Sequence, residues 1–155
     1  MKFYFIIFFC LCSCASAPDL EAPQAYEKEF AANFEETWRA LQQAIISYPL
    51  KINNMELGQV QTTSIRSGTQ FKPPPATNIK AAGYRYSLTI SLLKISPVIT
   101  RVSILKDVMV RRDFISKPEA KYSDGFEENQ ILYRIQRELE IEKILLRDSK
   151  KKNKT

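Results

Sequence analysis

The sequence has no histidine and only four glycines among its 155 residues. Histidine is the usual general base near neutral pH and the commonest ligand of transition metals, so its absence removes the ordinary forms of both sites. Four glycines supply no glycine-rich loop of the kind that cradles phosphate groups. We therefore expect no catalytic residues, no metal and no cofactor. An enzyme built on carboxylates from distant segments stays open as a third hypothesis.

Acidic residues occur as sequence neighbours within the expected helices, as in Glu35-Glu36 and Glu127-Glu128. Helix residues meet when they are three or four positions apart, whereas adjacent residues point to different faces. We therefore expect each of these pairs to diverge instead of meeting in a cleft.

Cysteine is confined to the first fourteen residues, at Cys10, Cys12 and Cys14. Lys2 precedes an unbroken apolar run over residues 3–11, which has the plan of a secretory signal and is too short to span a bilayer. Because no cysteine follows Cys14, an exported domain has no disulfide available and must depend on its hydrophobic core.

The segment Leu11-Cys12-Ser13-Cys14 resembles the signal of bacterial lipoproteins, in which an apolar residue and two small residues precede an acylated cysteine. The resemblance implies that residues 1–13 are a lipoprotein signal peptide and that Cys14 carries diacylglycerol and acyl chains such as palmitate. Cys12 is a less usual residue at its position. Cleavage after Ala17 is the alternative, but Pro18 lacks an N–H and is unfavourable directly after a scissile bond.

A lipid on Cys14 implies that the membrane is a partner of this protein. One acyl chain holds a protein only marginally, whereas several chains make dissociation negligible. Ala15, not Asp, follows the cysteine. By the sorting rule of enterobacterial lipoproteins this implies the outer membrane, with the domain facing the periplasm. Nucleic acid is excluded as a partner because an exported lipoprotein does not routinely meet it.

The formal net charge is +6, and much of it lies in the run Lys150-Lys151-Lys152-Asn153-Lys154. A terminal basic run is usually a solvated tail, so we expect residues 148–155 to form a basic disordered tail. Contact of this tail with anionic lipid headgroups or acidic glycans is the alternative.

The chain between these ends is expected to form one domain, residues 33–147, after a flexible tether over residues 14–32 that carries Pro18 and Pro23. Asn33 is a good helix N-cap, with Glu36 in the position of a capping-box acid. The helix should end before Pro49. Its apolar face is formed by Phe34, Trp38, Leu41, Ile45 and Tyr48.

The pattern after this helix predicts four strands and a second, longer helix. Alternating apolar and polar residues predict the strands, and a 3.6-residue period predicts the helix. The simplest α+β arrangement packs the long C-terminal helix on a four-stranded antiparallel sheet. The expected strands are residues 50–54, 59–66, 84–92 and 98–112, with a long proline-containing loop over 67–82 and the helix over 126–146.

Several short motifs resemble the helix-grip domain of the BamC family, accessory lipoproteins of the outer-membrane β-barrel assembly machinery, and of related small lipoproteins. The resemblance implies a helix-grip fold, an envelope protein partner and a non-enzymatic interaction or scaffold role in envelope biogenesis. It covers one helix-grip unit. The motifs are Thr37-Trp38-Arg39-Ala40-Leu41, Tyr48-Pro49-Leu50, Gly58-x-Val60-x-Thr62, Arg85-Tyr86-x-Leu88-x-Ile90 and Thr100-Arg101-Val102-x-Ile104.

Four aromatic residues are candidates for an interface or for the lining of a ligand cavity: Trp38, Phe71, Tyr84 and Tyr86. Trp38 is expected in the core or, failing that, at an interface. Helix-grip domains elsewhere hold apolar ligands between sheet and helix. The second hypothesis is therefore a binding module for a lipid or another apolar ligand held between the sheet and the C-terminal helix.

Overall fold

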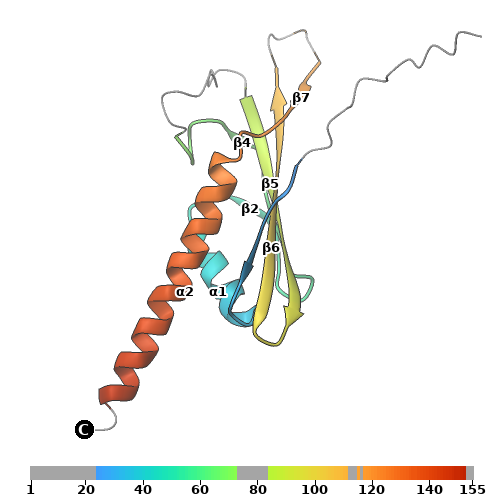
Figure 1. Ribbon diagram of the computed structural model, residues 1–155. Coiled ribbons are helices and arrows are strands. Elements are labelled where there is room, and N and C mark those ends of the chain that lie inside the picture. Colours follow the sequence, from blue (N-terminus) through green and yellow to red (C-terminus); the bar gives the residue numbers. More distant parts are fainter. Residues whose placement is uncertain (1–23, 73–83, 112–114, 116, 153–155) are drawn as a thin grey trace, which may run out of the picture.

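Figure 1 shows the computed structural model, which describes residues 24–72, 84–111, 115 and 117–152. Two helices, α1 (Phe34–Ala44) and α2 (Phe126–Lys152), pack against each other on one face of an antiparallel sheet. The described chain is therefore α+β, with a large antiparallel sheet and a long C-terminal helix, as expected. Because α1 shares the covered face, the long helix does not cover the sheet alone.

The sheet has seven strands among the described residues, so the expected number of four is wrong. Five strands follow the order β1-β6-β5-β3-β2, while β4 pairs with β5 and β7 pairs with β6. All pairings are antiparallel. The strands are β1 (Tyr26–Phe30), β2 (Leu50–Asn54), β3 (Gln59–Thr62), β4 (Ile65–Arg66), β5 (Tyr84–Ser96), β6 (Ile99–Val110) and β7 (Glu119–Lys121).

Strand β1 lies in the segment expected to be a tether, so that expectation is wrong for Tyr26–Phe30. The strand pairs with β6 over its whole length and buries Phe30, while Glu27 and Glu29 face solvent. Three charges in five residues hide the alternation that would have predicted it. The rest of the expected tether, up to residue 23, lies outside the described residues, as do the signal peptide and Cys14.

The strand expected over residues 59–66 is divided into β3 and β4 because Thr63 and Ser64 leave the regular ladder. The Leu88 N–H donates to the Thr62 hydroxyl at 2.9 Å, so a side chain takes the place of a backbone acceptor. The Thr63 N–H turns to the Pro49 carbonyl at 2.9 Å. Both contacts interrupt pairing for two residues without leaving these donors unsatisfied.

Helix α1 begins as expected and ends earlier than expected. Asn33 is the N-cap, and Asn33 and Glu36 form a reciprocal capping box. The helix ends at Ala44 rather than near Tyr48, and a turn closed by the Tyr48 N–H to the Ile45 carbonyl follows it. This turn frees Tyr48 from the helix and sends its side chain toward the start of α2.

Helix α2 begins at Phe126 and continues to Lys152. The disordered tail expected from residue 148 is therefore wrong for residues 148–152, while residues 153–155 lie outside the described part. No glycine or proline interrupts this stretch, and lysine and arginine are good helix formers that suit the negative end of the helix dipole.

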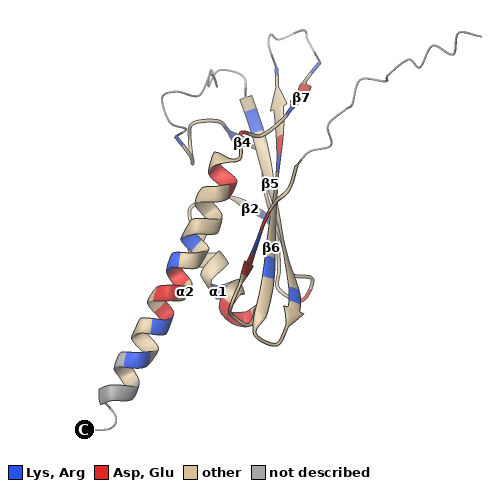
Figure 2. Cartoon of the chain, in the orientation of Figure 1, with Lys and Arg blue, Asp and Glu red and all other residues tan. Residues whose placement is uncertain are grey.

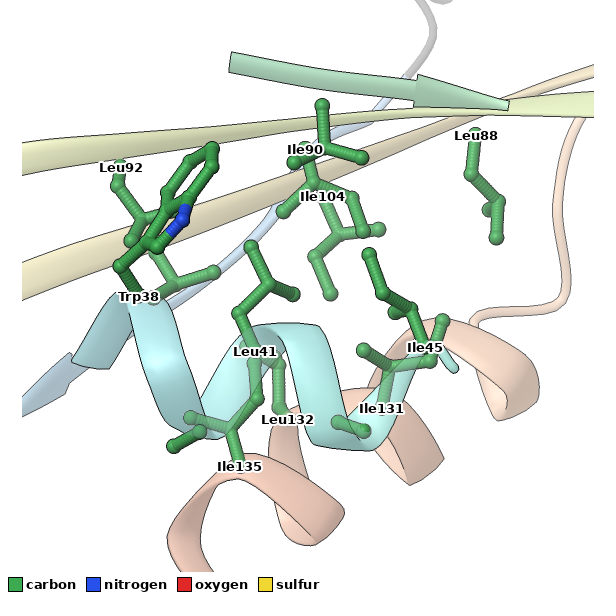
Figure 3. Close-up of a cluster of buried hydrophobic side chains, with 14 of the residues drawn as sticks. Trp38, Leu41, Ile45, Leu88, Ile90, Leu92, Ile104, Ile131, Leu132 and Ile135 are labelled. Carbon is green, nitrogen blue, oxygen red and sulfur yellow. The ribbon is translucent and has the colours of Figure 1, made fainter. Parts of the chain in front are cut away.

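The core fills the space between the sheet and the two helices (Figure 3). Leu41 of α1 and Ile45, directly after the helix, lie between the strands and α2. Trp38 is buried beside Leu92, so its expected place in the core is confirmed. The remaining large core residues come from the strands and α2: Val60, Leu88, Ile90, Val102, Ile104, Ile131, Leu132, Ile135 and Leu139.

Candidate functional site

Charged side chains are buried at the end of the core where α2 begins. We call Tyr48, Tyr86, Lys106, Glu127 and Glu128 the Glu127 cluster. The hydroxyls of Tyr48 and Tyr86 donate to Glu127 Oε1 at 2.9 Å and 2.7 Å. The Lys106 ammonium lies 2.9 Å from Glu127 Oε2. Oε1 of Glu127 thus accepts two hydrogen bonds, whereas Oε2 has the ion pair and no hydrogen bond within the described residues.

The members of the cluster come from four parts of the fold: the turn after α1, β5, β6 and the first turn of α2. Lys106 is paired with Leu88 and continues the inward-facing row of β6 that contains Ile104. Glu127 lies in the first turn of α2, where the dipole of the helix favours a carboxylate. Figure 2 shows the acidic residues at this end of the helix.

Gly125 sets the entry of the chain into α2. It has a φ of +73°, a left-handed conformation that side-chain-bearing residues rarely adopt. A Cβ at this position would lie 2.2 Å from the Tyr26 ring, so only glycine fits against β1. The turn therefore aims Glu127 at the strands while Tyr26 packs against its outer side.

The Lys106 ammonium is also held by aromatic rings. It lies 4.7 Å from the centroid of the Tyr86 ring and 5.9 Å from that of Phe71, distances at which a ring face attracts a cation. Burial, followed by the interactions with Glu127, raises the pKa of both Tyr48 and Tyr86 well above the ordinary value. Their hydroxyls therefore stay protonated and remain donors.

Glu128 is fully buried, and neither of its carboxylate oxygens has a hydrogen-bond partner among the described residues. Burial raises the pKa of this carboxyl. The Ser123 hydroxyl, close by but outside hydrogen-bonding geometry, and the charge of Lys106 offset part of the rise. Lys106 balances the charge of Glu127, so a second negative charge on Glu128 has no counterion in the cluster.

The cluster is built to hold elements together. Its donors connect the turn after α1, strand β5 and strand β6 to the start of α2. Two tyrosine hydroxyls donate to Oε1 of Glu127 and Lys106 forms an ion pair with Oε2, so this carboxylate is held by three other segments of the fold. The described residues contain no group of three or more potential metal ligands.

The four aromatic candidates do not share one site. Phe71 and Tyr86 meet around Lys106, and Tyr84 lies two residues along β5 with Lys121 5.8 Å from its ring. Trp38 lies on α1, away from the turn that carries Tyr48. Its ring stacks on that of Phe34, with the ring centroids 6.3 Å apart. The layer where the second hypothesis would hold a ligand is occupied by side chains of α1 (Figure 3).

Sequence reasoning missed Lys106 and misjudged Glu127 and Glu128. Alternate residues of β6 face the core, and this alternation continues from Val102 and Ile104 to Lys106. The sequence pattern could therefore have predicted that Lys106 points inward. The two glutamates have different neighbours, as expected, but their burial was not predicted. Glu127 faces the strands and Glu128 lies by Ser123, because the first turn of α2 is enclosed on more than one side.

Exposed apolar residues gather at the other end of the sheet, around the β2–β3 turn and the β5–β6 turn. We call Met55, Leu57, Leu93, Ile95 and Val98 the apolar tip; Leu57 is 71% and Val98 67% exposed. The two turns adjoin, since the Leu92 N–H donates to the Gly58 carbonyl at 2.7 Å. Tyr86, near the opposite end of β5, belongs to the Glu127 cluster, so the two features mark opposite ends of the sheet.

No family model and no curated protein matches this chain. Among solved structures it is similar to a conserved protein from Geobacillus kaustophilus, over 74% of this chain and 93% of that one, at 13% identity and a TM-score of 0.33. A TM-score this low carries no argument about fold or function. Neither described helix has the length and apolar character needed to cross a membrane.

We expect Lys106→Met to lower the free energy of unfolding by about 3–5 kcal/mol, because it leaves the buried Glu127 carboxylate without its counterion. Urea denaturation measures this. Adding Glu127→Gln should recover part of the loss. The matched control is Arg101→Met, which breaks the exposed ion pair with Glu29 and should cost about 1 kcal/mol or less. If Lys106→Met and Arg101→Met both lowered the free energy of unfolding by the same small amount, the structural role of the cluster would be contradicted.

The buried Glu128 carboxyl predicts a pH dependence of stability. Because its pKa in the folded chain lies above the ordinary value of 4.5, its contribution is complete below that pH and is lost as the pH rises through the folded-state pKa. Glu128→Gln should therefore be more stable than the parent at neutral pH, and the difference should shrink below about pH 4.5.

Denaturation curves across this pH range test the expectation for Glu128. Glu56 is exposed in the β2–β3 turn, so Glu56→Gln is the control. We expect it to change the free energy of unfolding only slightly, and by the same amount at every pH. A parent that gains stability over Glu128→Gln as the pH rises would show that Glu128 is stabilised as an anion.

Proposed function

We propose that this protein is a lipid-anchored lipoprotein on the periplasmic side of the outer membrane, whose domain is a non-enzymatic protein-interaction module in envelope biogenesis. The observation that carries the proposal is Leu11-Cys12-Ser13-Cys14, directly after Lys2 and the apolar run of residues 3–11. This order of a basic residue, a short apolar run and a cysteine after small residues resembles the signal of exported, acylated proteins.

The position of β1 supports anchoring close to the membrane. Tyr26, the first residue of β1, follows Cys14 by 26 − 14 = 12 residues. An extended chain of that length spans about 40 Å. The anchor would thus connect to a strand of the sheet through a short segment, and the start of β1 would stay within about 40 Å of the bilayer.

Two features of the folded domain support an interaction role. The apolar tip places five large apolar side chains around adjoining turns, and exposed apolar groups gathered in this way are typical of protein interfaces. The buried Glu127 carboxylate accepts from two tyrosine hydroxyls and pairs with Lys106, contacts that are typical of a structural role. A role in outer-membrane protein assembly, as in the BamC family, is the narrower form of the proposal and rests on the sequence motifs.

Processing of the precursor tests the anchor. Cys14→Ser should leave the precursor uncleaved and unacylated, because the residue that accepts the lipid is gone. Mass spectrometry of the membrane fraction measures both modifications. Cys12→Ala is the matched control and should be processed normally, since a small residue suits that position. Normal cleavage of the Cys14→Ser chain would overturn the lipoprotein assignment.

Affinity capture tests the interaction role separately. The acylated parent, purified from detergent-solubilised envelopes, should retain an envelope protein that the double variant Leu57→Ser, Leu93→Ser loses, because that variant removes two exposed anchors of the apolar tip. Loss of each side chain should not unfold the domain, as both are exposed. The same set of proteins on parent and variant would exclude the tip as the interface.

A further inference from the structure

The C-terminal end of α2 continues beyond the body that the rest of the helix packs against (Figure 1). The last contacts with the domain are the ion pair of Arg39 with Glu142, at 2.6 Å, and the bond from the Lys143 ammonium to the Ala31 carbonyl, at 3.3 Å. The helix nevertheless runs to Lys152. A helix of 27 residues is about 40 Å long, so its end forms a separate projection.

This projection carries large apolar side chains that nothing in the described chain covers. Ile144, Leu145 and Leu146 are 51–63% exposed, and Ile141 is 40% exposed. Ile141, Ile144 and Leu145 are three and four positions apart, a spacing that places them on one surface of the helix. Leu146 extends that surface toward the buried side of α2, which carries Ile135 and Leu139 earlier in the helix.

A basic strip runs beside the apolar surface. Lys143 and Arg147 are four positions apart and therefore neighbours on the helix, and both are exposed, although the Lys143 ammonium also donates to the Ala31 carbonyl. In the sequence from residue 141 to the end, six side chains are basic and two are acidic, so their charges sum to 6 − 2 = +4. One of the two acids, Glu142, is paired with Arg39.

We propose that the end of α2 over residues 141–147 docks on an anionic lipid surface, as a second membrane contact of this protein. A helix with Ile and Leu on one side and Lys and Arg on the other is typical of segments that lie in the bilayer interface. Such an interface offers both partners that the helix needs, acyl chains below and anionic headgroups above. A second copy of the same helix does not, because two ends of charge +4 repel each other.

The two contacts would fix how the domain lies on the bilayer. The chain enters the domain at Tyr26, which packs on Gly125 immediately before α2 begins. The anchor and the docked segment are therefore at opposite ends of α2. With a tether of about 40 Å and a helix of similar length, both reach one bilayer when the domain lies lengthwise along it. This arrangement uses the proposed anchor, but the docking of the helix is a separate property.

A thiol-attached fluorophore at position 145 reports the docking directly. In the acylated protein Cys14 is blocked, so Leu145→Cys supplies the sole free thiol after removal of residues 1–13. Reconstituted in vesicles of phosphatidylglycerol and phosphatidylcholine, the label should shift to the blue and resist an aqueous quencher. In pure phosphatidylcholine, or at high salt that screens the headgroups, it should stay accessible. Labels at Leu57→Cys, in the apolar tip, are the control and should stay accessible throughout.

Charge variants measure how much the basic side chains contribute to docking on the anionic surface. Each basic side chain near an anionic surface contributes about a five-fold preference for it. Lys143→Gln with Arg147→Gln should therefore lower the ratio of docked to undocked helix roughly 25-fold, whereas Lys121→Gln with Arg85→Gln, distant in the fold, should leave it unchanged.

Three outcomes would overturn the proposal. One is a label that stays accessible on anionic vesicles. Another is equal protection on phosphatidylcholine, or after loss of both charges, which would assign the contact to apolar burial alone. The third is protection that rises with protein concentration without vesicles, which would identify a second copy as the occupant. If mass spectrometry finds no acyl chain, the anchor fails; the same label on the chain with its three leader cysteines changed to serine still tests the docking.

Discussion

The fold depends on how the carboxylate of Glu127 is compensated inside the domain. An uncompensated buried charge is costly, and here the Lys106 ammonium and two tyrosine hydroxyls offset that cost together. These donors come from β5, β6 and the turn after α1, so the carboxylate is satisfied only when all of these segments meet the start of α2. Tyr48 lies in the turn after α1, outside the helix, and from there its hydroxyl reaches Glu127. Specific contacts at this end complement the non-directional packing of the core.

Much of the fold was predictable from local pattern. The capping box of Asn33 and Glu36, the alternation of β5 and the apolar row of α2 each indicate their element without reference to the rest of the chain. Strands β1 and β7 could not be predicted in this way. They add backbone hydrogen bonds to β6, and β7 is exposed along its whole length. A strand that is stabilised mainly by backbone pairing with a neighbouring strand needs few buried side chains. Its own sequence therefore shows little alternation of apolar and polar residues.

The Glu127 cluster shows the same limit for a site. Lys106 continues the inward row of β6, so its direction was predictable, but its partner was not, since Glu127 is 21 positions away and belongs to another element. The burial of Glu128 depends on the enclosure of the first turn of α2, which is a tertiary property. Local patterns indicate which way a side chain points and leave open what it meets there.

Strand β1 also decides how the domain responds to force. It is an edge strand of five residues that pairs along its length with β6, and Tyr26 is held against Gly125. Tension on the preceding chain therefore acts along the strand and loads its hydrogen bonds to β6 together, in shear, instead of opening them one at a time. A domain attached through such a strand resists pulling from its N-terminal side. The same tension would first be transmitted to the turn that positions Glu127.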